Sequence, residues 1–173
     1  MIQNSLIQSP VLRRRSIRKY IDRPIEREAI KMLLQAGMAA PSAEDERPWH
    51  FIVINDSSMR NLIPFIHPDM HILKNAPALI LVCGDLTRQK ASGFWIQDCS
   101  ASTENILIEA QLLNMGAVWL GIYPIEGRID GFRQFFQIPE HIIPFSIIAI
   151  GYPGEYKEPA DRYDESRVHY QKW

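Results

Sequence analysis

The chemistry-bearing residues of this sequence are concentrated near its beginning, where Arg13 to Tyr20 contains five cations and a serine. The whole chain has 19 Lys and Arg against 20 Asp and Glu, so this positive charge is a local feature. If the segment is extended, alternate side chains share one face, and Arg14, Ser16 and Arg18 point in the same direction. Two guanidinium groups and a hydroxyl would suit a phosphate group, because the planar guanidinium matches phosphate oxygens in pairs.

This cluster has two other interpretations. A solvated basic turn would carry the same charges without binding a ligand. A nucleic-acid contact is disfavoured, because no basic face continues from the cluster and the net charge of the chain is near zero. We therefore expect no nucleic-acid partner.

Two later segments could bring the backbone close to a flat ligand. In the first, residues 39–51, Pro41 should end a helix, and the turn that follows offers backbone amides and the Ser42 hydroxyl. In the second, residues 116–127, extended backbone beside glycine permits close approach to a ring. Each segment also has an ordinary structural interpretation, as a helix-to-strand loop and as a core strand with its turn.

Other chemistries find little support in the sequence. His67 and His71 flank an aspartate, but no third metal ligand is evident nearby, so we expect surface histidines and no metal. There is no Gly-x-Ser-x-Gly motif, no Walker-type phosphate loop and no Gly-x-Gly-x-x-Gly motif, which removes the usual support for hydrolase, kinase and Rossmann functions. The two cysteines, Cys83 and Cys99, are expected to be buried and reduced.

The 173 residues predict a single domain, residues 1–173, that can bury a sizeable core. The longest helical pattern, residues 94–115, is apolar around much of its circumference and is expected at the centre of the fold. Helices and strands in alternation predict an α+β (mixed α/β) domain. Helices are expected at 2–12, 26–38, 59–66, 94–115 and 128–136, strands at 49–54, 78–83, 117–123 and 146–152, and irregular structure at 67–75.

The end of the chain predicts a subunit contact. Residues 155–173 form a polar arm that nevertheless carries aromatic side chains, and a second subunit would cover them. No apolar run reaches the roughly 18–20 residues that a membrane helix needs. At the start of the chain the positive charges follow the apolar residues, which is the reverse of a secretory signal. We therefore expect a cytoplasmic homodimer without a membrane partner.

Taken in order, these segments resemble the nitroreductase family over nearly the whole chain. The family opens with an Arg-Arg-Ser-x-Arg-x-aromatic motif and continues with an Ala-Pro-Ser motif that ends in Pro-Trp. It then has an Ala-Pro before a strand, a Gly-x-x-Trp-x-Gly segment after the long helix, a Gly-Tyr-Pro strand end and a C-terminal arginine. The matching residues here are Arg14–Tyr20, Ala40–Trp49, Ala76-Pro77, Gly116–Gly121, Gly151-Tyr152-Pro153 and Arg162.

The resemblance implies flavin mononucleotide (FMN) at the interface of a homodimer, on a mostly antiparallel sheet packed by helices around a long core helix. The arm, residues 155–173, would pack on the partner subunit. The phosphate, ribityl chain and pyrimidine edge of FMN would be held by Arg14, Arg15, Ser16 and Arg18, with Arg162 reaching the phosphate. The ring would be lined from the partner subunit by Pro41, Ser42 and Ala43, and on its other side by Trp119, Leu120 and Gly121.

The sequence departs from the family pattern at two places. Asp45 and Arg47 replace the usual Asn and Gln and cannot make the same amide hydrogen bonds, although they could pair with each other. Ala160 replaces a customary basic residue two positions before the C-terminal arginine. The segment that contains Glu126 and Gly127 also resembles a flavin-contacting segment of larger family members, so two segments compete for the flavin N5 position.

The implied activity is transfer of electrons from NADH or NADPH to a small electrophile, such as a nitroaromatic or a quinone, in a ping-pong cycle. The flavin would carry the chemistry, so no catalytic acid or base is expected from the protein. Arg18, near the pyrimidine edge, would stabilise the negative charge of the reduced flavin. A reductive dehalogenase or a flavin-destroying enzyme on the same scaffold and a non-catalytic flavin-binding dimer are the alternatives.

Overall fold

The computed structural model describes residues 9–66 and 68–173. Most of the helix expected at 2–12 lies outside the described residues, which begin with the short α2, Pro10–Arg13, whose N-cap is Ser9. Four longer helices follow: α3 (Arg27–Met38), α4 (Ser57–Ile66), α5 (Trp95–Leu112) and α6 (Glu126–Phe136). The strands are β1 (Trp49–Ile54), β2 (Ala78–Asp85), β3 (Gly116–Gly121) and β4 (Ile142–Gly151). Short 3₁₀ turns form η1 (Ala43–Asp45), η2 (Pro68–Asn75), η3 (Leu86–Arg88) and η4 (Glu165–Arg167).

The described residues form one antiparallel sheet with the strand order β1-β2-β4-β3. The two central strands, β2 and β4, are buried along almost their whole length. β4 begins at Ile142, earlier than the expected strand at 146–152. The strand can include Pro144 because this residue lies at a register shift opposite Cys83. A proline is tolerated at such an irregularity because no ladder hydrogen bond is required of it there.

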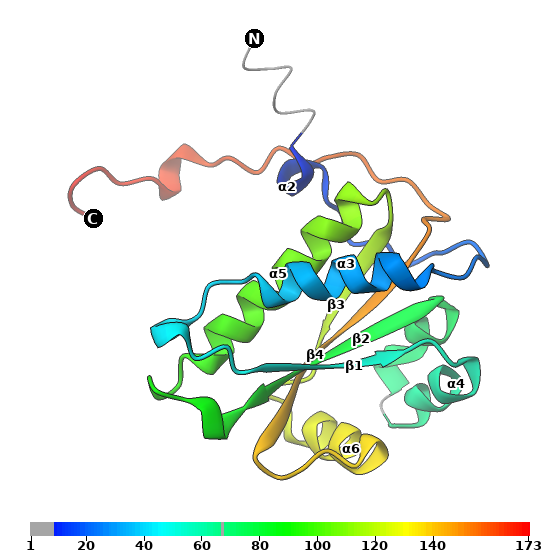
Figure 1. Ribbon diagram of the computed structural model, residues 1–173. Helices are drawn as coiled ribbons and strands as arrows, with labels where there is room; N and C mark the ends of the chain where they lie inside the picture. The colour runs from blue at the N-terminus through cyan, green and yellow to red at the C-terminus, as the bar shows by residue number, and fades with distance from the viewer. Residues whose placement is uncertain (1–8, 67) are drawn as a thin grey trace.

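Helices cover both faces of this sheet, as Figure 1 shows. In β2, Ile80 and Val82 face the cluster that contains α3 and α5, whereas Leu79 and Leu81 face the cluster that contains α4 and α6. Because neighbouring side chains on a strand point to opposite faces, the continuous apolar run of β2 supplies both cores. The expected α+β architecture with a mostly antiparallel sheet is confirmed.

α5 is the central helix, as expected. Its buried residues recur every three or four positions and form one stripe along the helix, and most of its other residues are half-buried, so little of its surface is open to solvent. The ring of Trp95 packs so closely on β2 that a Cβ added to Gly84 would lie 2.4 Å from Trp95 Cε3. Cys99 and Cys83 are both free and buried, which confirms the expectation of reduced thiols.

Two connections differ from the sequence expectation. The stretch expected to be irregular, 67–75, is a short 3₁₀ helix, η2, over its described part, a common form for a connector between longer elements. α4 begins at Ser57, where Asp56 Oδ1 accepts hydrogen bonds from Ser58 Oγ and, at 3.1 Å, from the Met59 N–H.

None of the helices within the described residues combines the length and hydrophobicity that crossing a membrane requires.

The C-terminal arm leaves the body of the molecule beside α2, so that both ends of the described chain lie on the same side (Figure 1). The side chains of Tyr156, Tyr163, Tyr170 and Trp173 are exposed. Among the described residues, the hydrogen bonds that join the arm to the domain come from Glu155 and Lys157 near its beginning.

Candidate functional site

The arginine segment lies in extended form beside the sheet. Ser16 forms a parallel bridge with Ala117 of β3, and Tyr20 forms an antiparallel bridge with Pro153 at the end of β4. The Ile17 N–H donates to the Ala117 carbonyl at 3.0 Å, and the Ile17 side chain is buried. Because Ile17 faces the core, the residues on either side of it face outward.

Ser16 and Arg18 face a cavity of about 240 Å³, here called the cationic cavity. Its walls are Arg14, Arg15, Ser16, Arg18, Lys157 and Arg162. Among the described residues, five cations and a hydroxyl line this cavity and no carboxylate does. Converging guanidinium and ammonium groups favour an anion with several acceptor oxygens, such as a phosphate group. The five residues that the resemblance assigns to the phosphate, ribityl chain and pyrimidine edge of FMN, Arg162 included, therefore meet at one place.

Arg14 is further fixed by an ion pair, with its Nε 3.1 Å from Glu104 Oε1 on α5. The Arg14 side chain is largely buried, and Glu104 is partly exposed. This pairing holds the arginine against the central helix, so its direction is set before any ligand binds.

Lys157 is the residue of this cavity that sequence reasoning missed. Its Nζ donates a hydrogen bond of 2.7 Å to the carbonyl oxygen of Ser16 and lies 3.3 Å from Glu155 Oε1. The resemblance drew attention to Ala160, where the family carries a basic residue. Lys157 precedes that position by a few residues and supplies the cation from the same stretch of chain.

Glu155 fastens the arm to the arginine segment. Its Oε1 accepts hydrogen bonds from the Arg18 N–H at 2.6 Å and from the Lys19 N–H at 3.3 Å. The Arg18 N–H and the Lys157 ammonium lower the pKa of Glu155, so this carboxylate stays ionised at neutral pH. The two ends of the chain are thus joined where the cationic cavity forms.

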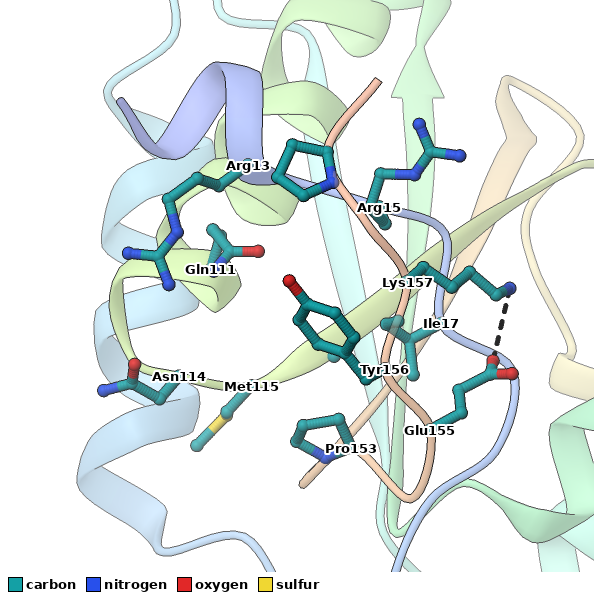
Figure 2. A pocket seen from close by; sticks show the side chains of 12 residues that line it. Arg13, Arg15, Ile17, Gln111, Asn114, Met115, Pro153, Glu155, Tyr156 and Lys157 are labelled. Carbon is teal, nitrogen blue, oxygen red and sulfur yellow. Dashed lines mark ion pairs between the residues drawn. The ribbon is translucent and has the colours of Figure 1, made fainter. Parts of the chain in front are cut away.

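Two further hollows border the cationic cavity. The first, of about 250 Å³, shares Arg15 and Lys157 with it, and Figure 2 shows Tyr156 between these cations and the amides of Gln111 and Asn114. The second, of about 500 Å³, shares Arg18 and is lined by Lys19, Tyr20, Asp22, Arg60, Lys74, Asn75, Ala76 and Pro77. Arg18 therefore lies between the cationic cavity and an open groove.

The other proposed contact residues do not line the cationic cavity in a single chain. Pro41, Ser42 and Ala43 lead into the turn η1, and the Ala43 N–H donates to Asp98 Oδ1 at 3.0 Å. Trp119, Leu120 and Gly121 form the end of β3, where the Trp119 ring packs 5.9 Å from that of Phe145. Glu126 and Gly127, the competing segment, begin α6.

The substituted residues of the second motif pair with each other. Arg47 Nε lies 2.6 Å from Asp45 Oδ1, and Arg47 Nη2 lies 2.7 Å from Asp45 Oδ2. The Arg47 guanidinium lowers the pKa of Asp45. The pairing that the sequence left open is confirmed, and it draws both side chains toward each other on the surface.

The two histidines that the sequence singled out are His67 and His71. His67 lies outside the described residues, and His71 is exposed. Within the described part of the chain no group of three His, Cys, Asp or Glu side chains could hold a metal ion.

An antiparallel sheet between two helical layers, with a cationic cavity formed by both ends of the chain, defines an α+β domain suited to a phosphate-bearing ligand. The chain belongs to the nitroreductase family, whose model, described as "Nitroreductase family", matches residues 11–72 and 67–152.

Relatives of similar length support this assignment. A protein of Methanothermobacter thermautotrophicus, provisionally named NADH dehydrogenase/NAD(P)H nitroreductase, is 51% identical over 160 residues, which cover 92% of this chain and 84% of that protein. A crystal structure from Parabacteroides distasonis with the same provisional name is 39% identical, with a TM-score of 0.91 over 98% of this chain and 99% of that one. An FMN-dependent nitroreductase from Clostridium difficile is 28% identical, with a TM-score of 0.89 over 96% and 99% of the two chains.

Proposed function

We propose that this protein is an FMN-dependent oxidoreductase that uses NADH or NADPH to reduce a small electrophile, and that it works as a cytoplasmic homodimer. The observation that carries the proposal is the cationic cavity, which is lined by five cations and Ser16, while Glu104 and Glu155 pair with Arg14 and Lys157 from outside its lining. Relatives named as nitroreductases, one of them as FMN-dependent, support the same activity.

The residues present fit the phosphate end of FMN. The phosphate carries close to two negative charges and several acceptor oxygens, which the guanidinium groups of Arg14, Arg15 and Arg162 can meet in pairs. Lys157 adds an ammonium, and Ser16 adds a hydroxyl that can donate to the phosphate or the ribityl chain. Arg18, between this cavity and the neighbouring groove, would hold the pyrimidine edge.

When bound, FMN would supply the redox chemistry, accepting a hydride equivalent from the reduced nicotinamide and passing electrons to a nitroaromatic or a quinone in ping-pong order. The protein would bind and orient FMN and would polarise its ring. The positive charge of Arg18 near the pyrimidine edge would favour the additional negative charge of the reduced cofactor. No side chain is assigned as a catalytic acid or base.

The homodimer is part of this proposal. Pro41, Ser42 and Ala43 do not line the cationic cavity of their own chain, and a second copy would bring them to the flavin ring as the resemblance implies. The arm, residues 155–173, exposes four aromatic side chains that a partner subunit would cover. In this arrangement Trp119, Leu120 and Gly121 would line the other side of the ring.

The decisive experiment compares FMN with riboflavin, which lacks the phosphate. We expect about one FMN per chain from the absorption spectrum, a dimer by sedimentation, and FMN binding at least about tenfold tighter than riboflavin binding, because charged hydrogen bonds are lost with the phosphate. NADPH followed by a nitroarene under anaerobic conditions should bleach and then restore the flavin bands. A protein that takes up no FMN, or binds riboflavin equally well, contradicts the proposal.

A further inference from the structure

Two acidic side chains are buried together under the loop that carries Pro41, Ser42 and Ala43. Glu46 comes from that loop and is 2% exposed, and Asp98 comes from the first turn of α5 and is 5% exposed. Carboxyl groups are rarely buried this completely without a charge or hydrogen-bond partner. The pair plays no part in the cationic cavity.

In each carboxyl group, one oxygen accepts hydrogen bonds from backbone N–H groups. Glu46 Oε2 accepts from the Lys90 N–H at 2.7 Å and from the Ala91 N–H at 3.1 Å. Asp98 Oδ1 accepts from the Ala43 N–H at 3.0 Å. The pair therefore ties the loop to α5 and to the segment that precedes it.

The remaining oxygens, Glu46 Oε1 and Asp98 Oδ2, are fully buried and have no donor among the described residues. The Glu46 N–H donates to the Ala43 carbonyl at 2.9 Å and the Ala43 N–H donates to Asp98 Oδ1, so the two carboxyl groups meet at the same turn of the loop. Each shifts the pKa of the other, as hydrogen-bond partners do. Two ionised carboxylates cannot form such a bond, since both offer only acceptors. One proton between Oε1 and Oδ2 satisfies both atoms and removes one buried charge.

The surroundings assign this proton to Asp98. Burial raises the pKa of Asp98, and the Glu46 carboxylate raises it further. Burial also acts to raise the pKa of Glu46, but the N–H groups of Ala91 and Lys90 outweigh it and lower that pKa. Glu46 is thus the acceptor and Asp98 the donor of the shared proton.

The charged and titratable groups around the pair do not replace this proton. The Lys90 ammonium donates to the Glu44 carbonyl at 2.8 Å, and Arg88 Nε donates to the Glu46 carbonyl at 3.2 Å. Asp45 and Arg47 pair with each other on the surface. The titratable groups of α5 and β2 in this region include the thiols of Cys99 and Cys83, whose pKa values burial raises. They also include the Asp85 carboxylate, which accepts hydrogen bonds from the N–H and the hydroxyl of Thr87.

The loop needs such a fastening because its backbone is strained. Glu44, Asp45 and Arg47 have φ values of 47°, 52° and 45°, in the left-handed region. Residues other than glycine adopt this conformation at a cost, because the Cβ atom crowds the backbone. Without side-chain hydrogen bonds to hold it, the loop would relax to a different shape.

We propose that Glu46 and Asp98 share a single proton, and that this pair holds residues 41–47 in the shape that the cofactor ring requires. The ring contact rests on the proposed function, since Pro41, Ser42 and Ala43 are the residues expected to line the flavin bound to the partner subunit. Glu46 and Asp98 are then positioning residues. At high pH, loss of this proton leaves two negatively charged carboxylates next to each other. Their repulsion then frees residues 41–47 from this attachment.

Amide variants test the shared proton directly. In Asp98→Asn the oxygen can still accept from the Ala43 N–H, and the new NH₂ donates to Glu46 as the acid did. In Glu46→Gln the oxygen can still accept from Lys90 and Ala91, and the NH₂ donates to Asp98. In the double variant, which combines Glu46→Gln and Asp98→Asn, the two groups that face each other are both NH₂ donors, so no hydrogen bond forms between them. Asp130→Asn, on the exposed side of α6, is the matched control.

The first measurement needs no cofactor. Folded Asp98 keeps a proton that the unfolded chain has lost above the ordinary pKa of 3.8, so wild-type stability contains a contribution that falls as pH rises toward the folded pKa. Within that window the unfolding equilibrium constant of wild type, relative to Asp98→Asn, should rise up to about tenfold per pH unit. Asp130→Asn should follow wild type, and the double variant should unfold more readily than either single variant. Equal pH slopes in wild type and Asp98→Asn, or a double variant as stable as the single variants, would overturn the shared proton.

The second measurement is flavin affinity against pH. Wild type should bind FMN and riboflavin more weakly as Asp98 ionises, with the same relative loss for both because the loop is expected to contact the ring. Asp98→Asn should bind with no such loss. Flavin binding with the same pH dependence in both proteins would overturn the role of the pair in positioning the loop. Failure of every variant to bind flavin would instead contradict the proposed function, while the unfolding data still decide whether the proton is shared.

Discussion

The ammonium of Lys157 lies 2.7 Å from the carbonyl oxygen of Ser16, which joins the C-terminal arm to the N-terminal arginine segment at the wall of one cavity. Glu155 strengthens this junction by accepting from the Arg18 N–H at 2.6 Å. The beginning and the end of the chain therefore build the cationic cavity together, and an arm that detaches would take Lys157 and Arg162 with it.

Replacement of Lys157 by alanine should weaken FMN binding by about tenfold, since one charged contact to the phosphate and one tie of the arm are lost. Riboflavin binding should change much less, so the ratio of FMN affinity to riboflavin affinity should fall. Isothermal titration of both flavins measures the two affinities. Lys31→Ala, on the exposed side of α3, serves as the control and should bind both flavins like wild type. An equal loss for riboflavin and FMN would show that Lys157 does not meet the phosphate.

Replacement of Arg18 by alanine should lower the reduction potential of bound FMN as well as its affinity. The cation at the pyrimidine edge stabilises the more negative, reduced form, so its removal favours the oxidised form. We expect a shift of about 30 mV, which for a two-electron couple corresponds to about 1.4 kcal/mol. Potentiometric titration measures it, with Lys31→Ala on the exposed side of α3 as the control. The absence of a downward shift would refute this role for Arg18.

Gly84→Ala should destabilise the fold by about 1–3 kcal/mol, because the new Cβ would lie 2.4 Å from the Trp95 ring between β2 and α5. Gly127→Ala is the matched control. Apart from its chain neighbours and the nearby backbone of α6 itself, no described atom lies within 4 Å of a Cβ at that position, so the change should be neutral or stabilising by about 0.5 kcal/mol. Urea unfolding of both variants gives the comparison. Equal stabilities would mean that Trp95 can move away at little cost.

The two thiols should be inert in the folded protein. Burial raises the pKa of Cys83 to about 12 and raises that of Cys99 as well, so the reactive thiolate form is scarce at neutral pH. A chromogenic disulfide reagent at about pH 8 should label neither thiol in the native state and both in guanidinium chloride. Rapid labelling of the native protein would contradict the burial of these residues.

Several features could be predicted because they depend on neighbouring residues. Arg14, Ser16 and Arg18 alternate along an extended segment, so their common direction follows from backbone geometry alone. Asp45 and Arg47 are two positions apart, and their pairing needs only a turn. The start of β4 was missed because Pro144 is unfavourable in a regular strand, and only its place at a register shift opposite Cys83 explains why the strand continues through it.

The amino-acid order alone thus determined the periodic elements, the arginine cluster and the family resemblance, since each rests on residue types at short, fixed spacings. Tertiary structure decided the strand order, the meeting of Lys157 with Ser16 across 141 positions, and the burial of Glu46 against Asp98. Contacts between distant residues depend on how the whole core packs and which polar groups it must satisfy, and no local pattern carries that information.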